Sequence, residues 1–464
     1  MSIKSISTLK PDDVPFKLPN NWSWYKLGDI IAEYQQGLIR ANRELNGIGV
    51  PYLKMNNLDN DGGYNLNKLE FTEVTDEEIK RYNLYKGDFL LNVRNSKELV
   101  GKTCVIGSHE FDIVYNHMLV RIKFHEGIAG SYINALLKTP VMRKFIDRCK
   151  KGTTTVIALY QKDLYEIPIP IPDTDTHNSI VSIVENLSRK IELNNCINVE
   201  LEAMAKTLYD YWFVQFDFPD KDVKPYKTSG GEMIWNEGLK REIPAGWEVG
   251  ILSDLGDIIG GSTPSKENLE YFSNQGTAWI TPKDLSMNGD NKFISKGEID
   301  VSDKGLKAAS LKIMPKGTIL LSSRAPVGYM AIARDLVTTN QGFKSFVPKA
   351  DYSTPFIFYT IKNSLPEIVN NASGSTFKEI SGGTLKTIKT CLPEKLIINN
   401  FTDKVSPIFE RQNVLELENQ QLASLRDWLL PMLMNGQVRV GDSGEKKVEY
   451  EVEEEMRMAA EPEE

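Results

Sequence analysis

The chain has 464 residues, and its 55 Lys and Arg against 63 Asp and Glu give a formal net charge of −8. That length suggests two to four domains, and 41% apolar with 25% charged residues is a globular composition. The charge by itself argues against a nucleic-acid binder, which typically has a basic excess. However, residues 441–464 carry ten acidic and three basic residues, so this segment holds −7 of the total and the rest of the chain is nearly neutral.

Several classes of protein are excluded by what the sequence lacks. No stretch approaches the ~18 consecutive apolar residues of a membrane-spanning helix, and residues 1–11 lack the apolar core of a signal peptide. The four cysteines are scattered without a Cys-x-x-Cys pair, which supports neither a disulfide framework nor a zinc site. We therefore expect a cytoplasmic protein without a metal and without a membrane partner.

Sequence blocks of the first half recur in the same order in the second half, about 225 residues later. Each copy shows short strands punctuated by Gly and Pro, and one helix is expected in each, around residues 130–150 and 354–371. The matching blocks are residues 18–22 and 243–247, 27–31 and 255–259, 50–53 and 277–280, 86–94 and 316–324, 100–101 and 327–328, and 152–154 and 374–376. The sequence thus predicts two copies of one domain, residues 1–175 and 243–398.

A long helix is predicted after each copy, at residues 176–213 and 399–436. Between His177 and Trp212 there is neither Pro nor Gly, and a 36-residue helix would be about 54 Å long. The first seam, with Asn at two interior positions, and the second seam follow heptad spacing: Ile180, Val184, Leu187, Ile191, Asn194, Asn198, Leu201, Ala205, Leu208 and Trp212, then Val405, Ile408, Leu415, Asn419, Leu422, Leu425 and Leu429. We expect the helices to pair antiparallel; the alternative is that each packs only on its own domain.

The predicted fold class is therefore α+β, with two pseudo-repeated, strand-rich globular domains separated by two long antiparallel coiled-coil helices. Residues 214–242 are turn-rich and form the expected linker between the copies. Residues 437–464 form an acidic C-terminal tail that is expected to be disordered, because it has little apolar surface to bury.

Motifs for catalysis are absent from the sequence. Gly101-Lys102-Thr103 resembles the end of a phosphate-binding loop, but the earlier glycine that the motif needs is replaced by Ser96. Gly260-Gly261-Ser262 does not extend to a dinucleotide or methyl-donor loop, and a carboxylate cluster at Asp220 and Asp222 falls in the linker. We interpret the chain as having no catalytic residues and no bound cofactor of its own.

Polar and basic residues near the ends of the predicted strands recur in both copies. Arg suits guanine and Asn or Gln suits adenine in the major groove, while Ser, Thr and Lys suit phosphates. Each residue alone is better explained by turn chemistry; the recurrence favours DNA binding, and the differences between copies favour two different half-sites. The candidates are Gln36, Arg40, Asn56, Arg94, Lys97, Asn116, Thr153 and Thr154 in the first copy, and Thr263, Ser265, Lys283, Arg324, Asn340, Gln341, Lys344, Ser375 and Thr376 in the second.

Several motifs together resemble the specificity (S) subunit of type I restriction-modification systems, over residues 18–440. The first copy departs from the family pattern: it has Gln35-Gln36-Gly37 in place of the Gly-x-Thr-Pro run and Asn92-Val93-Arg94 in place of Ser-Ser-Arg. The matching motifs are Gly260-Gly261-Ser262-Thr263-Pro264-Ser265, Trp279-Ile280-Thr281, residues 320–328, residues 340–344, and the helix-end signatures at residues 209–213 and 425–431.

The resemblance implies two target-recognition domains that each read one half of an asymmetric, interrupted DNA sequence, with the helices as a ruler. It also implies two methyltransferase subunits, which bring S-adenosylmethionine, and restriction subunits, which bring ATP and Mg²⁺. The helix residues expected to dock these partners are Ile180, Leu187, Leu201, Leu208, Trp212, Leu415, Leu422 and Leu429. The rival hypothesis is a duplicated coiled-coil adaptor that organises proteins without reading DNA.

Overall fold

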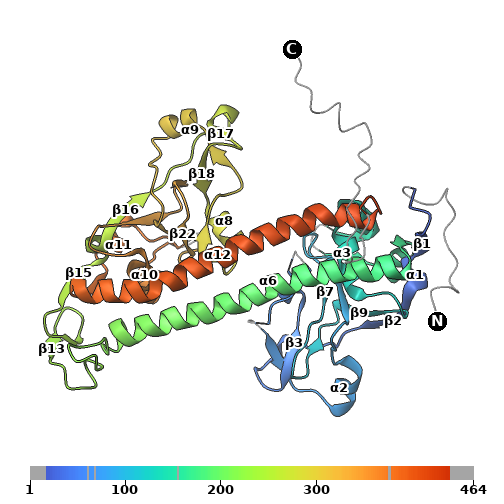
Figure 1. Cartoon of the computed structure of the whole chain (residues 1–464), viewed down its shortest axis with the longest axis horizontal. Coiled ribbons are helices and arrows are strands. Elements are labelled where there is room, and N and C mark those ends of the chain that lie inside the picture. Colours follow the sequence, from blue (N-terminus) through green and yellow to red (C-terminus); the bar gives the residue numbers. More distant parts are fainter. Residues whose placement is uncertain are drawn as a thin grey trace, which may run out of the picture. The chain divides into compact units, whose positions relative to one another are not determined.

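The computed structural model describes residues 17–59, 62–66, 69–153, 156–324, 326–374 and 378–438 (Figure 1). The chain divides into two compact units, the first of which is assembled from two separate segments. This first unit contains residues 1–191 and 421–464, and the second contains residues 192–420. Of the acidic tail predicted at residues 437–464, all but residues 437–438 lies outside the described residues.

The first unit is built on two small sheets. Its main sheet is antiparallel with strand order β2-β9-β5-β7, and its second sheet has the order β4-β3-β8 with a parallel β3–β8 pair. The main-sheet strands are β2 (Ile31–Gln36), β9 (Leu119–Phe124), β5 (Phe89–Asn92) and β7 (Thr103–Val105); the second-sheet strands are β4 (Glu70–Thr72), β3 (Val50–Leu53) and β8 (Val114–Tyr115). Minor strands are β1 (Ser23–Lys26) with β12 (Pro168–Ile171), and β6 (Arg94–Asn95), β11 (Ile157–Leu159) and β10 (Lys150–Gly152).

The second unit repeats this arrangement, which confirms the predicted duplication. Its main sheet has the order β16-β24-β21-β22-β19 and its second sheet β17-β20-β18-β23, again with one parallel pair, β18–β23. The main-sheet strands are β16 (Gly256–Gly260), β24 (Lys344–Pro348), β21 (Ile319–Leu321), β22 (Met330–Ala333) and β19 (Phe293–Ile294). The others are β17 (Phe272–Ser273), β20 (Asp300–Val301), β18 (Thr277–Ile280), β23 (Val337–Thr339), β15 (Glu248–Ile251) with β25 (Lys389–Leu392), and β13 (Met233–Asn236) with β14 (Arg241–Pro244). Strand β19 extends the main sheet beyond the position where the first unit's sheet ends at β7.

Short helices connect the strands of both units. In the first unit the single helix expected around residues 130–150 is divided into α3 (Gly130–Lys138) and α4 (Pro140–Cys149). Pro140 explains the break, because it disfavours helical backbone at Thr139, whose side chain instead caps α4 by accepting from Met142 N. The other helices are α1 (Leu27–Ile30), η3 (Asn42–Glu44), η4 (Met55–Asn57), α2 (Asp76–Tyr82), α5 (Gln161–Tyr165), α7 (Leu252–Leu255), η6 (Leu269–Tyr271), α8 (Pro282–Met287), α9 (Asp303–Ala308), α10 (Thr354–Asn370) and α11 (Gly382–Lys386).

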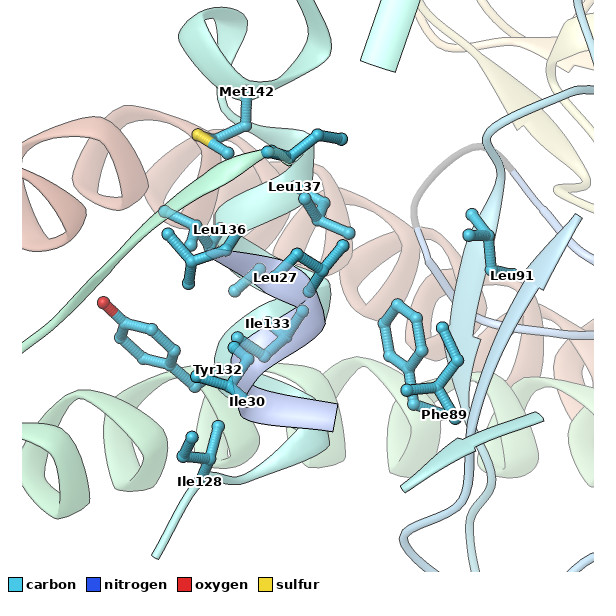
Figure 2. Packing of buried hydrophobic residues seen from close by; sticks show 14 of the residues in the cluster. Leu27, Ile30, Phe89, Leu91, Ile128, Tyr132, Ile133, Leu136, Leu137 and Met142 are labelled. Carbon is cyan, nitrogen blue, oxygen red and sulfur yellow. The ribbon is translucent and has the colours of Figure 1, made fainter. Parts of the chain in front are cut away.

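The core of the first unit lies between its main sheet and helices α1 and α3. Figure 2 shows Phe89 of β5 together with Leu27 of α1 and Ile133 of α3. Ile180, near the start of the first long helix, and Leu430, near the end of the second, are buried in the same cluster. The two separate segments that form this unit thus share one hydrophobic core.

The core of the second unit is rich in aromatic side chains. The Phe213 ring centroid lies 5.0 Å from those of Phe356 and Phe401, and Trp212 lies 5.9 Å from Phe401. The segment after the first long helix, expected as a linker, contributes Phe216, whose ring meets that of Trp247 edge to face at 5.4 Å. Burial of these rings attaches the start of this segment to the globular part of the unit.

Each of the two long helices contributes residues to both units. Helix α6 (Thr174–Tyr209) has 36 residues and continues into the π-helical turn η5 (Asp210–Val214), while α12 (Lys395–Met434) has 40 residues. At 1.5 Å per residue their lengths are about 54 and 60 Å. Every residue of the predicted α6 seam is buried or half-buried, whereas Leu425 of the predicted α12 seam is exposed.

In the second unit the two helices run antiparallel. Their contacts show this, because residues further along α6 meet residues that come earlier in α12. Asn194 Nδ2 donates to Asn419 Oδ1 at 2.9 Å, and Gln412 Nε2 donates to Asn198 O at 3.2 Å. Asn419 Nδ2 in turn donates to Asn195 Oδ1 at 2.7 Å. An amide pair inside a helix seam favours the one register that satisfies it. Of the three predicted seam asparagines, Asn194 and Asn419 meet each other, whereas Asn198 contacts Gln412 through its backbone oxygen.

Candidate nucleic-acid interface

The second unit gathers polar side chains where β16 ends and β24 begins. Gly260 pairs with Lys344 across these strands, and a Cβ added to Gly260 would lie 3.7 Å from Lys344 Nζ. The Thr263 hydroxyl hydrogen-bonds the Gln341 side-chain oxygen, which joins the loop after β16 to the loop before β24. Only glycine fits at position 261 in the first of these loops, since a Cβ on this residue would lie 2.1 Å from the Asn340 carbonyl oxygen.

Asn340 shapes the loop that presents these groups. Its side-chain oxygen accepts from Gly342 N at 2.8 Å, and its own N–H donates to Ile280 O at 3.0 Å. This side-chain-to-backbone turn is a conformation that Asn forms readily. A Cβ on Gly342 would lie 3.6 Å from Arg324 Nε, so the turn brings Asn340, Gln341 and Arg324 to one place. We name Thr263, Arg324, Asn340, Gln341 and Lys344 the second polar surface.

Arg324 is the most informative residue of this surface. Its side chain is half-buried, and within the described part of the chain its guanidinium makes no hydrogen bond or ion pair. Burying a charged group without a partner is costly, whereas a guanidinium with five unused donors binds an acceptor strongly. The guanidinium donors of Arg324 are therefore unpaired within the described residues.

The other residues of the second copy that we predicted to bind DNA are not part of the second polar surface. Ser265 is exposed two residues beyond Thr263. Lys283 is exposed on α8 and pairs with Glu298 at 2.6 Å, an arrangement in which both side chains remain in solvent. Ser375 and Thr376 lie outside the described residues, as does Thr154 of the first copy.

The first unit has the same loop at the equivalent place. Asn116 Oδ1 accepts from Met118 N at 2.8 Å, and Asn116 N donates to Leu53 O at 2.9 Å, which repeats the bonds of Asn340. Gln36, exposed at the end of β2, donates from Nε2 to His117 O at 2.7 Å. Burial and then the nearby Arg94 charge lower the pKa of His117, so its ring is neutral near pH 7.

Arg94 and Arg324 occupy equivalent positions in the two units. Val93 N donates to Met118 O at 3.0 Å, and Ser323 N donates to Gly342 O at 2.7 Å, so the residue before each arginine is held in the same way. Arg94 is exposed. We name Gln36, Arg94 and His117 the first polar surface; each surface thus combines an arginine with a side chain from the asparagine-shaped loop.

Two residues of the first copy that we predicted to bind DNA form bonds to other residues of the first unit. Arg40 forms an ion pair with Glu78 at 2.7 Å and also donates to Thr72 Oγ1 at 3.2 Å; this bond from Arg40 lowers the pKa of Glu78. Asn116 Nδ2 donates to the buried Tyr52 hydroxyl at 2.8 Å. Arg40 and Asn116 therefore have structural roles within the first unit.

The remaining residues of the first copy lie in three exposed places. Asn56 is on η4, Lys97 follows β6, and Thr153 follows β10, where its hydroxyl accepts from Val156 N at 3.4 Å. No hydrogen bond between these three residues and the first polar surface is found among the described residues. Within the same described ranges, no cluster of three or more metal-ligating side chains occurs, and no helix has the length and hydropathy to cross a membrane.

The helix residues expected to dock partners divide into two groups. Ile180, Trp212 and Leu415 are buried inside their own units, and only the other five keep part of their surface accessible: Leu187, Leu201, Leu208, Leu422 and Leu429. Beside them the structure exposes Tyr211 at 36% and Trp428 at 62%. The helix-end signatures contain both residues, but the heptad pattern selects Trp212 and Leu429, one position further along.

The fold and the two polar surfaces define a class of protein: a duplicated α+β protein with two long helices and one polar surface in each unit. Comparison with known proteins agrees with this class. The family model for the type I restriction modification DNA specificity domain matches residues 19–203 and again residues 244–418. The chain belongs to this family, and it is a type I restriction-modification specificity subunit.

Individual relatives support the same assignment. The HindI specificity subunit of Haemophilus influenzae is 30% identical over 344 residues, which are 64% of this chain and 74% of that protein. The MjaIX specificity subunit of Methanocaldococcus jannaschii is 39% identical over 198 residues, 41% of this chain, and the chain spans only 45% of that relative's length. The crystal structure of the S subunit from M. genitalium has the same fold, with a TM-score of 0.55 at 15% identity, covering 90% of this chain and 98% of that one.

Proposed function

We propose that the chain reads a bipartite, asymmetric DNA target for a type I restriction-modification complex, one half-site with each polar surface. The observation that carries the proposal is the pair Arg94 and Arg324, held at equivalent positions beside asparagine-shaped loops. Arginine binds the O6 and N7 acceptors of guanine in the major groove. The neighbouring side chains differ, with His117 in one unit and Gln341 in the other, and this supports two different half-sites.

The chemistry of the complex belongs to the partners in this proposal. Methyltransferase subunits supply S-adenosylmethionine and methylate adenine, and restriction subunits supply ATP, Mg²⁺ and cleavage. The residues of this chain bind and orient the duplex so that a flipped adenine can enter a partner's active site. Because the body of the chain is nearly neutral and phosphate neutralisation provides much of the affinity for DNA, tight binding should require the partners.

Co-expression with its methyltransferase, followed by genome-wide mapping of methylated adenines, tests the proposal. We expect a single interrupted motif with two different halves, and no such motif when the methyltransferase is expressed alone. Methylation without any bipartite motif would instead favour the adaptor hypothesis. Assembly of the complex, measured on the same preparation, shows whether the partners were present.

We further propose that Tyr211 and Trp428 are anchors for two copies of one partner, the methyltransferase subunit. The two residues occupy the same position of the repeated helix-end signature, where Asp210 pairs with Lys206 and Asp427 pairs with Arg426. Exposed aromatic residues of this kind often dominate the energy of an interface. One anchor in each unit therefore suits a stoichiometry of two partners for one chain.

Replacing either anchor with alanine is expected to weaken one partner site by about 2 kcal/mol, or roughly 30-fold. Native mass spectrometry near the dissociation constant should then show one methyltransferase bound to Tyr211→Ala or Trp428→Ala, and none bound to the double variant. Phe111→Ala is the matched control, since Phe111 is 48% exposed and lies in the loop between β7 and β8. Two partners retained by the double variant would contradict these anchors.

A further inference from the structure

A buried cluster of charged side chains in the second unit joins its main sheet to both long helices. Lys292 Nζ, from the residue before β19, donates to Glu202 Oε2 of α6 at 2.5 Å and to Gln412 Oε1 of α12 at 2.6 Å. The same ammonium lies 3.8 Å from the centre of the Phe409 ring. A single side chain of the recognition domain thus contacts both helices.

A second contact is made one turn further along α12. The Glu416 carboxylate accepts from Lys292 N at 2.7 Å, from Phe293 N at 3.1 Å and from Arg334 Nη2 at 2.6 Å. Arg334, which follows β22, also donates from Nε to Asn413 Oδ1 at 2.6 Å. The edge strand β19 and its neighbour β22 are therefore both tied to α12.

Burial of this cluster is nearly complete. The side chains of Lys292, Arg334 and Glu416 are only 5%, 6% and 3% exposed. Desolvation lowers the pKa of Lys292 to about 8 even though Glu202 opposes this shift, and it raises the pKa of Glu416. Buried ion pairs add little net stability compared with apolar packing, but their directional bonds can enforce one arrangement.

The first unit has no equivalent cluster among its described residues. Within those residues its main sheet ends at β7, and its globular part meets α6 through the apolar cluster around Ile180, together with contacts of His177 and Ser131. Apolar packing is less directional than charge-assisted hydrogen bonds. Within the described residues the charged cluster is therefore a feature of the second unit alone.

We propose that Lys292, Glu202, Arg334 and Glu416 are positioning residues that hold the second recognition domain at one fixed angle to the helix pair, and so set which half-site spacing is accepted. The inference rests on the proposed function, because spacing has a meaning only for a bipartite target. Within the described part of the chain, no hydrogen bond or ion pair joins these four residues to the second polar surface. Loosening them should leave base reading intact.

The test uses the complete complex with its methyltransferase and duplexes that carry the mapped target with its natural spacer, or with one base pair more or less. The variants are Lys292→Met, which keeps the side-chain length without the charge, and Glu202→Gln, a milder change at a partly exposed position. Lys304→Met, which removes an exposed ion pair with Glu270, is the control.

For Lys292→Met and Glu202→Gln we expect the preference in kcat/KM for the natural spacer to fall about tenfold, while the rate on the natural target changes less than threefold. Discrimination against single-base changes in the second half-site should stay as in the unmodified chain. Unchanged spacer preference in a folded Glu202→Gln complex would overturn the inference. Lack of a bipartite target in the unmodified complex would instead refute the proposed function, so the two failures are distinguishable.

Discussion

Arg324→Ala is expected to reduce base discrimination at one position of the half-site read by the second unit by about 1–3 kcal/mol, or roughly 5- to 150-fold. The guanidinium is half-buried and makes no hydrogen bond or ion pair within the described residues, so its removal breaks no internal contact of this kind. Stability should therefore change by no more than about 0.5 kcal/mol. The measurement is kcat/KM for methylation of duplexes with each base pair of the target changed in turn.

Two arginine variants of the first unit serve as controls for this prediction. Arg94→Ala, at the equivalent position, should reduce base discrimination in the other half-site instead. Arg40→Ala should lower the stability of the first unit without changing base preference, because Arg40 is paired with Glu78. An Arg324→Ala complex that keeps the full base preference of the unmodified complex would contradict the assignment of the second polar surface.

The largest effect on stability is expected from Phe401→Ala in the core of the second unit. Phe401 is fully buried, and its ring meets those of Tyr209, Trp212 and Phe213 at centroid distances of 6.0, 5.9 and 5.0 Å. Truncation of such a residue leaves a cavity and costs about 3–5 kcal/mol. The result should appear as a lower free energy of unfolding in urea.

Phe111→Ala is again a suitable control, because a half-exposed ring loses little when it is truncated. Its effect should remain within about 0.5 kcal/mol. If Phe401→Ala lowered the unfolding free energy by less than about 1 kcal/mol, the aromatic cluster would not be the tightly packed core that the ring distances indicate.

Repetition makes much of the fold predictable. Two copies of a block such as Lys86-Gly87 and Lys316-Gly317 identify the duplication without any structural information, and heptad spacing with Asn194 and Asn419 identifies the helix pair. The division of α3 from α4 escapes prediction because apolar spacing continues across Pro140. Here the local restriction that proline places on its predecessor prevails over the periodic pattern.

The candidate site is predictable only as a set of residue types. Arg40 and Arg324 are the same residue type, yet Arg40 forms an ion pair within its unit and Arg324 belongs to a polar surface. Only the position of Glu78 in the structure distinguishes the two. The charged cluster around Lys292 gives no signal in the sequence, since its members come from residues 202–416 and no short motif links them. Contacts of this kind depend on tertiary packing, which periodicity does not encode.

The shared core of the first unit has a consequence for how the chain folds as it is made. Leu430, Leu433 and Met434 are 2–3% exposed and pack in the same cluster as Trp22 and Ile180. All residues of the second unit, 192–420, leave the ribosome before these three do. The unit that is begun first is therefore completed last, and until residues 430–434 emerge, its nascent core exposes an apolar surface that the finished protein conceals.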